Sequence, residues 1–215
     1  MTRSLPEVTR SNPFCTRHVR PGAIAFHFAN GDEMAALLAV LAESGFRGEI
    51  VGPHGSGKST LLASLSAALE AEGRTVCHFT LSAGQRRFRA AWRAAAAAAD
   101  IVLVDGYEQL SWWARVSLRR FCRARGLVVT SHRSTGLRRL VSTAPSAALA
   151  WRLVQALYGT AEPLVGRDEV DAACARCGGN LREVFFELYD LHEERARQEG
   201  NPRLRQASGL SFGRP

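Results

Sequence analysis

One glycine-rich segment carries the residues best suited to phosphate chemistry. It reads Gly52-Pro53-His54-Gly55-Ser56-Gly57-Lys58-Ser59 and is followed by Thr60. The spacing of its glycines before Lys-Ser is that of a phosphate-binding loop (P-loop), in which backbone N–H groups cradle phosphate oxygens. We therefore predict that residues 52–60 bind a nucleotide.

Three side chains of this pattern have distinct expected roles. Lys58 would reach the β- and γ-phosphates, and the Ser59 hydroxyl would ligate Mg²⁺. The apolar run Ile101–Val104 ends at Asp105, a second oxygen ligand suited to magnesium at the end of a strand. The sequence thus predicts a site for Mg-ATP.

Lys58 is the only lysine among 28 basic residues, and the other basic residues are arginines. An ammonium group is a compact point charge that fits between phosphate oxygens, whereas a planar guanidinium is larger. The absence of another lysine also excludes the Asn/Thr-Lys-x-Asp motif by which P-loop proteins bind guanine. ATP is therefore the expected nucleotide.

The elements around these residues predict an α/β fold with a parallel sheet of about five strands flanked by helices. Apolar strand-like runs alternate with helical patterns, and this order needs crossover connections. The expected strands are 48–52, 75–81, 101–104, 127–130 and 137–142, with a further short one at 23–28. The expected helices between them are 34–44, 58–71, 85–98 and 111–125.

The pattern predicts four parts along the chain. Residues 1–22 are polar and proline-punctuated, which indicates an extended or disordered N-terminal arm, and residues 23–145 form the nucleotide-binding core. Residues 146–198 are wholly helical and form a small lid, followed by a flexible tail at 199–215. The lid helices are expected at 146–158, 168–177 and 181–197, the last with Asn180 and Glu183 as a capping box.

The order of motifs resembles the AAA+ and STAND ATPases. The P-loop, the Asp105 strand, the polar triplet Thr130-Ser131-His132 and the Gly179-Asn180-Leu181-Arg182 segment follow one another as in those families. The resemblance implies that Ser131, or else Thr130 or His132, senses the γ-phosphate, and that Arg182 reaches the nucleotide from the lid. It also implies that Asn12-Pro13-Phe14 lies near adenine. Ordinary roles as caps or solvated residues would explain the triplet and Arg182 equally well.

The chain departs from the usual AAA+ pattern after Asp105. The position that normally holds the glutamate for water activation is Gly106, and the nearest acid is Glu108. This spacing is similar to the NACHT branch of the STAND proteins, which implies that Glu108 polarises water. The alternative is that Glu108 only begins a helix, so slow hydrolysis is the expectation.

The formal net charge of +8 allows a nucleic-acid partner but supports it only weakly. The basic residues are spread along the whole chain, without a run of like charges or interleaved aromatic residues. We expect ATP as ligand and a protein partner that the sequence does not identify.

The cysteines and the hydropathy favour a reducing cytoplasm. The five cysteines are odd in number and mostly isolated, which does not suggest a disulfide framework, and no apolar stretch is long enough for a membrane span. Cys174 and Cys177 resemble half of a zinc knuckle, but structural zinc needs four ligands. We interpret them as cysteines at a helix end.

The leading function is an ATP-dependent switch with slow turnover. One alternative is a small-molecule kinase in which Arg133, Arg138 and Arg139 clamp a phosphate, and another is a DNA-associated ATPase. Leu81-Ser82-Ala83-Gly84-Gln85 is similar to an ABC transporter signature, but the segment between it and Lys58 is too short for the subdomain that those ATPases insert there.

Overall fold

A five-stranded parallel sheet forms the centre of the larger lobe. A computed structural model describes residues 12–24, 26–28 and 33–200. The spatial order of the strands is β2-β3-β4-β1-β5. Their bounds are Arg47–Val51 for β1, Val76–Thr80 for β2, Ile101–Asp105 for β3, Gly126–Ser131 for β4 and Arg139–Ser142 for β5. The predicted α/β fold class is confirmed.

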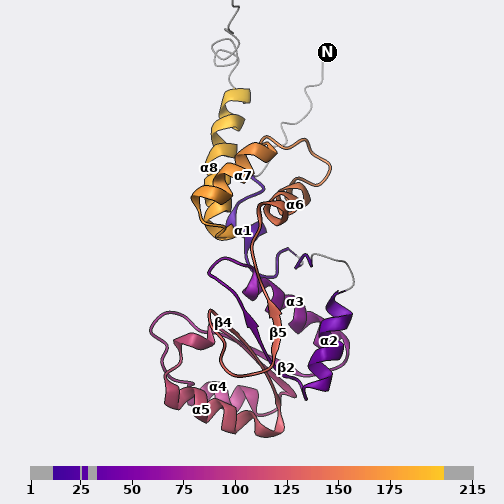
Figure 1. Cartoon of the computed structure of the whole chain (residues 1–215), viewed down its shortest axis with the longest axis vertical. Helices are drawn as coiled ribbons and strands as arrows, with labels where there is room; N and C mark the ends of the chain where they lie inside the picture. The colour runs from indigo at the N-terminus through magenta and orange to yellow at the C-terminus, as the bar shows by residue number, and fades with distance from the viewer. Residues whose placement is uncertain (1–11, 25, 29–32, 201–215) are drawn as a thin grey trace, which may run out of the picture.

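Helices cover both faces of this sheet (Figure 1). One face packs on α2 (Glu33–Glu43) and α3 (Lys58–Ala71) around Ile50, Leu61 and Leu103. The other packs on α4 (Ala90–Ala96), α5 (Trp112–Phe121) and the short turns η1 (Tyr107–Gln109) and η2 (Cys122–Ala124), with a core that includes Phe79, Val102 and Leu118. Burial on both faces explains why the central strands are continuous apolar runs.

The smaller lobe is a helical lid with its own core, drawn above the sheet in Figure 1. It contains α6 (Ala147–Tyr158), α7 (Arg167–Arg176) and α8 (Leu181–Gly200). Phe14, from the start of the described chain, is buried among them and contacts the rings of Tyr158 and Phe185. The lid core therefore depends on a segment distant in sequence from its helices.

Several local predictions are wrong. Residues 16–19 form a short helix, α1 (Thr16–Val19), where an extended arm was expected. In the described part of 23–28 there is no strand, only an isolated bridge between Pro21 and Ile24. The helix expected at 85–98 is limited to α4, and α8 extends beyond the predicted end at residue 197. Residues 1–11 of the arm and 201–215 of the tail lie outside the described residues.

No helix in the described ranges is both long and apolar enough to cross a membrane.

The strand order decides which residues meet at the carboxyl edge of the sheet. Because β4 lies between β1 and β3, the residues that follow it stand between the P-loop and Asp105. Ligands of open parallel sheets bind at this edge, outside the carboxyl ends of the strands. The topology alone thus brings three of the predicted motifs together.

Glu49 is a fully buried carboxylate in β1 that anchors the loop after β4. It accepts hydrogen bonds from Ser134 Oγ at 2.7 Å, from Thr135 N at 2.6 Å and from Thr135 Oγ1 at 2.7 Å. Burial raises the pKa of Glu49, but these hydrogen bonds and the charge of Arg139 together bring it below its ordinary value. The loop is therefore held by the ionised carboxylate.

We predict that Glu49→Gln lowers the free energy of unfolding at pH 7 by about 1–3 kcal/mol, because an amide accepts these bonds less well. The lowered pKa of Glu49 means that its contribution is present above the unfolded-state value of about 4.3 and is lost as pH falls through the folded-state value. Urea unfolding at pH 7 and pH 3 measures both effects. The control is Glu43→Gln, which removes an exposed ion pair with Arg138. Its free energy of unfolding should differ little from that of wild type at either pH. A wild-type advantage over Glu49→Gln that is as large at pH 3 as at pH 7 would contradict the role of the charge.

Candidate nucleotide-binding site

The P-loop connects β1 to α3 with the backbone shape that phosphate binding requires. Gly55 and Gly57 have φ of 66° and 87°, in the left-handed region that favours glycine. α3 begins at Lys58 and has no acidic residue in its first turn, so its N-terminal N–H groups and dipole remain available to an anion. The loop is closed by Ser56, whose hydroxyl donates to Pro53 O at 2.8 Å.

Lys58 is buried and folded back onto the loop. Its ammonium donates to Gly52 O at 2.7 Å and to Pro53 O at 2.5 Å. Burial lowers the pKa of Lys58, while the charges of Glu108 and Asp105 oppose that effect. A buried cation held by neutral carbonyls is a strong attractor for a phosphate group.

Asp105 is held by the neighbouring strand. Thr130 Oγ1 donates to Asp105 Oδ1 at 2.5 Å and accepts from Gly106 N at 2.9 Å. The Thr130 side chain is buried, and its hydroxyl fixes the carboxylate at the end of β3. Of the polar triplet, Thr130 is thus the residue that positions the predicted magnesium ligand.

His132 links Lys58 to Glu108. Its Nδ1 lies 3.4 Å from Lys58 Nζ and 3.2 Å from Gly52 O, and its Nε2 lies 2.9 Å from Glu108 Oε1. Its ring also contacts that of His54, with centroids 3.6 Å apart. The other oxygen of Glu108, Oε2, is buried without a hydrogen-bond partner among the described residues. An orphaned carboxylate oxygen beside a phosphate-binding lysine indicates a place for water or a ligand.

Ser131 has a different environment from His132. Its hydroxyl donates to Arg133 O at 2.6 Å, and its carbonyl accepts from Gly52 N at 3.2 Å. The side chain is buried and committed to its own loop. Within the triplet, the ring that reaches Lys58 is that of His132.

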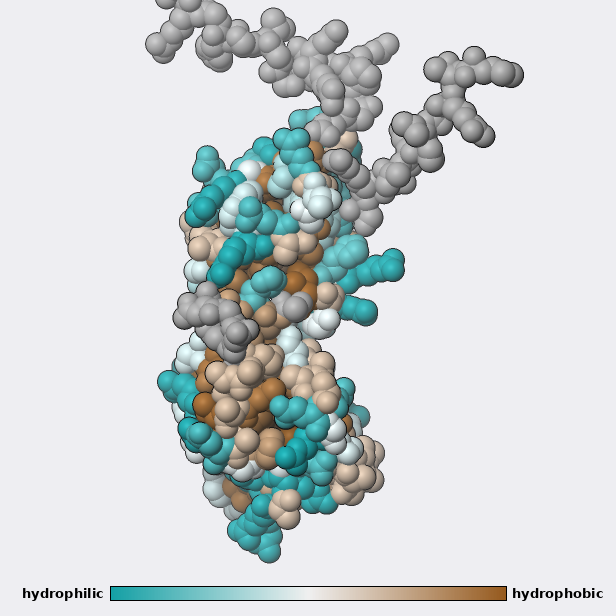
Figure 2. Space-filling view, turned by 90° about the vertical axis from the view of Figure 1, so that its right-hand side faces the viewer, coloured by the Kyte–Doolittle hydropathy of each residue, from teal (hydrophilic) through white to brown (hydrophobic). Residues whose placement is uncertain are grey.

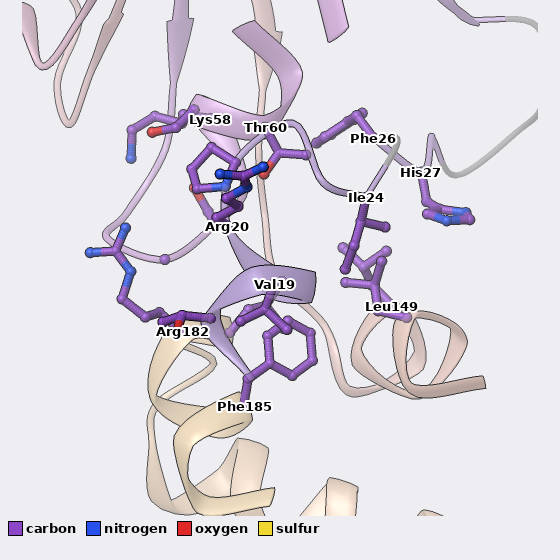
Figure 3. Close-up of a pocket in the computed structure, with 18 of the residues that line it drawn as sticks. Val19, Arg20, Ile24, Phe26, His27, Lys58, Thr60, Leu149, Arg182 and Phe185 are labelled. Atoms are coloured by element: carbon purple, nitrogen blue, oxygen red, sulfur yellow. The ribbon is translucent and has the colours of Figure 1, made fainter. Parts of the chain in front are cut away.

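A pocket of about 420 Å³ lies between the P-loop, the lid and the N-terminal segment 12–24, which we call the strap. Figure 3 shows Lys58 and Thr60 on one side of the pocket and Val19, Ile24, Leu149 and Phe185 on the other. Hydrophobic surface is visible on both lobes near their junction in Figure 2. The volume is within the range of small-ligand sites, and a polar end facing an apolar end suits a nucleotide.

The charged residues among those that line the pocket are all basic. Lys58 comes from the P-loop, Arg182 from the start of α8 and Arg20 from the strap. In Figure 3 the side chains of Arg20 and Arg182 extend toward the P-loop side. Asp105, Glu108 and Ser131 are not among the lining residues. Of these three, Glu108 is connected to Lys58 through His132.

The lid contacts the P-loop directly at Gly55. Leu181 N, in the first turn of α8, donates to Gly55 O at 3.2 Å. A side chain at Gly55 would clash with the lid, because its Cβ would lie 1.7 Å from Asn180 Oδ1. Asn180 caps α8 by accepting from Arg182 N at 3.2 Å and donates through its side chain to Glu183 at 2.8 Å. The N-cap is therefore present, but the predicted capping box is not, because the backbone N–H of Asn180 donates to Cys177 O and not to Glu183. This contact joins the lid to the phosphate-binding backbone.

The sequence did not predict the strap as a wall of the pocket. Its only signal was Asn12-Pro13-Phe14, but these residues anchor the strap to the lid: Asn12 Nδ2 donates to Tyr189 O at 3.0 Å and to Glu193 at 2.9 Å. The residues that line the pocket come later, from Thr16 onward. A mixed polar and apolar segment without periodicity gives no pattern from which to predict such a role.

The fold is that of AAA+ P-loop NTPases. It has a parallel sheet with β4 between β1 and β3, a P-loop after β1, an acid at the end of β3 and a helical lobe in contact with the P-loop.

Solved structures of a replication initiator share this fold. Domain III of DnaA from Thermotoga maritima superposes with a TM-score of 0.57 at 17% identity, covering 86% of this chain and 91% of that one. AMPPCP-bound DnaA from Aquifex aeolicus gives 0.55 at 15% identity, covering 81% of this chain and 68% of that one. DnaA bound to AMPPCP and single-stranded DNA gives 0.56 at 16% identity, covering 81% and 66%. The chain thus spans about two thirds of the longer structures, and these identities establish the fold alone.

No protein-family model matches the chain, and no curated protein matches it in sequence.

We predict that Gly55→Ala lowers ATP affinity about tenfold, because the methyl group would displace Asn180 and open the lid contact. Gly73→Ala is a matched control: its φ of 79° carries the same left-handed strain, but nothing lies within 4 Å of its Cβ. Calorimetric titration with Mg-ATP compares the two variants. Equal ATP affinity of both variants would show that the lid contact does not contribute to binding.

Proposed function

We propose that this protein binds Mg-ATP and acts as a nucleotide-dependent switch with slow ATP hydrolysis. The observation that carries the proposal is the pocket between the P-loop, strap and lid, whose charged lining residues are all cations. A nucleoside triphosphate matches that pocket at both ends, with phosphates at the P-loop and a base against the apolar wall. ATP analogues occupy the DnaA structures that share the fold, which supports the choice of nucleotide.

Ser59 and Asp105 are suited to hold magnesium. Both offer oxygen ligands, as this ion prefers, and Ser59 lines the pocket. Among the described residues no group of three or more His, Cys, Asp or Glu side chains is arranged to hold a metal ion, so the ion would depend on the nucleotide for further ligands. A bound Mg²⁺ would neutralise charge that develops on the phosphates.

Glu108 is the proposed residue for water activation. His132 holds one of its oxygens, and the other, which is buried without a hydrogen-bond partner among the described residues, would accept a proton from a water that enters the site with the nucleotide. In this structure the carboxylate is engaged by His132, which supports slow turnover. The NACHT-like subtype rests only on the Asp105–Glu108 spacing and stays a hypothesis.

The proposed role as a switch rests on the contact between the lid and the P-loop. Leu181 and Asn180 contact Gly55, and Arg182 lines the pocket, so a bound triphosphate would contact both lobes. A ligand that prefers the closed arrangement shifts the equilibrium toward it. The proposal includes a protein partner whose binding depends on the position of the lid.

The kinase alternative is not favoured. Arg138 pairs with Glu43 at 3.4 Å, and Arg139 lies 3.9 Å from Glu49. Neither these two arginines nor Arg133 line the pocket. The expected phosphate clamp is therefore not assembled at the P-loop.

We predict that Lys58→Ala weakens ATP binding at least about tenfold, because the buried cation is lost. Glu108→Gln should keep ATP affinity but lower the hydrolysis rate about 100-fold. Isothermal titration and phosphate release measure the two effects. Unchanged affinity in Lys58→Ala would refute the P-loop assignment, and unchanged turnover in Glu108→Gln would refute the assignment of the water-activating acid.

A DNA-associated ATPase is the second candidate, and the α4–α5 side of the sheet favours it. Residues 82–99 contain four arginines and residues 109–125 contain five, with no acidic residue in either segment. The two segments are in contact, since Arg93 Nη2 donates to Ser117 Oγ at 2.5 Å. Trp112 and Trp113 are 63% and 75% exposed at the start of α5. Both segments interleave arginines with aromatic residues in the sequence, contrary to the initial expectation, and folding brings the two segments together on one side of the sheet.

For this candidate we predict binding to single-stranded DNA that weakens steeply with salt. The double substitution Trp112→Ala/Trp113→Ala should weaken it about tenfold or more, because each stacked base contributes about 1–3 kcal/mol. Fluorescence anisotropy with an oligothymidylate measures the affinity. Arg152→Ala, an exposed residue of lid helix α6, is the control and should have little effect. Equal DNA affinity of the double variant and wild type would remove this candidate.

A further inference from the structure

Arg20 is a pocket residue for which the sequence motifs assign no role. It follows α1 in the strap and lines the pocket with Lys58 and Arg182. Its side chain is exposed, and no hydrogen bond or ion pair of its guanidinium occurs within the described ranges. A guanidinium that has no described partner, in a pocket whose charged lining residues are all basic, can bind an anionic ligand without first breaking an ion pair.

The backbone around Arg20 is fixed on both sides. Toward the lid, Phe14 is buried in the lid core and Arg20 N donates to Thr16 O at 3.1 Å. Toward the sheet, Ala23 N donates to Arg20 O at 3.0 Å, and Phe26 N donates to Ser64 Oγ of α3 at 3.2 Å. Arg20 is thus held at a defined place beside the P-loop helix, which lowers the entropy cost of its binding an anion.

We propose that Arg20 binds the phosphate chain of the nucleotide and is a specificity determinant for charged over uncharged adenosine ligands. The proposal rests on the proposed ATP site and extends it to the strap. Arg20 is on the P-loop side of the pocket in Figure 3, away from the apolar wall formed by Ile24, Leu149 and Phe185. Its guanidinium has the fork geometry that matches phosphate oxygens.

The phosphates would then be bound from three parts of the chain. Lys58 contributes a charge from the core, Arg182 from the lid and Arg20 from the strap. Because the strap is anchored in the lid core through Phe14, the charge of the ligand would bias the strap and the lid together.

The test compares Arg20→Ala, Arg20→Lys and Arg17→Ala in the full chain, each titrated with Mg-ATP and with adenosine. Arg17 is exposed on α1, the helix that Arg20 follows, but does not line the pocket, so Arg17→Ala removes the same charge without removing a pocket residue. We expect Arg20→Ala to raise the Kd for ATP about tenfold or more, Arg20→Lys to recover part of the loss and Arg17→Ala to match wild type. Adenosine affinity should change less than about twofold in all three variants, because adenosine carries no phosphate.

Two results would overturn the proposal while leaving the ATP site intact: ATP affinity of Arg20→Ala within about twofold of wild type, or an equal loss for ATP and adenosine, which would assign Arg20 to the shape of the strap. If wild type itself binds no ATP and Lys58→Ala behaves identically, the ATP site fails and the role of Arg20 fails with it. Thermal unfolding of the unliganded variants verifies that each one folds.

Discussion

The buried ammonium group of Lys58 is the constraint on which the site depends. A buried cation is costly unless it is paired, and burial accordingly lowers the pKa of this group. Without phosphate, Lys58 is stabilised by Gly52 O and Pro53 O, with His132 close to it. The two carbonyls are uncharged partners, so a phosphate oxygen would stabilise the ammonium more strongly. The loop therefore holds Lys58 in a conformation in which a bound phosphate would stabilise the ammonium group further.

The same group connects two regions that would otherwise be separate. The pocket lies on one side of Lys58, and Asp105 and Glu108 lie on the other, joined to it through His132 and through their charges. A triphosphate that draws Lys58 away from the loop carbonyls would also change the surroundings of His132. Binding in the pocket and the state of the proposed water-activating acid are therefore physically linked, and Gly55 extends the link to the lid through Leu181.

What the sequence predicted well was local or periodic. The P-loop has a fixed spacing, the strand before Asp105 is a continuous apolar run, and α3 was predicted to its exact bounds because both a glycine cap and a stripe of leucines mark it. The strap was missed because Phe14 is buried, and Val19 partly buried, by contacts with helices more than a hundred residues away, and such long-range contacts leave no period in the sequence. The Arg-rich α4–α5 side is a different case. Residues 86–93 and 112–125 already interleave arginines with Phe and Trp in the sequence, so the expectation of no such pattern was wrong, and folding adds only the contact between the two segments.

Gly106 shows how backbone geometry limits the chemistry. Its φ of 78° is in the left-handed region, and a Cβ there would lie 3.0 Å from Leu81 O, so a glutamate at this position would be strained and crowded. The turn that Gly106 permits, η1, brings Glu108 back to His132 at 2.9 Å. The acid is thus displaced along the chain because the strand exit has a shape that only glycine adopts readily. Restoring an acidic residue at 106 would therefore disturb η1 and Glu108 together, and it would not simply add the usual AAA+ glutamate to an unchanged site.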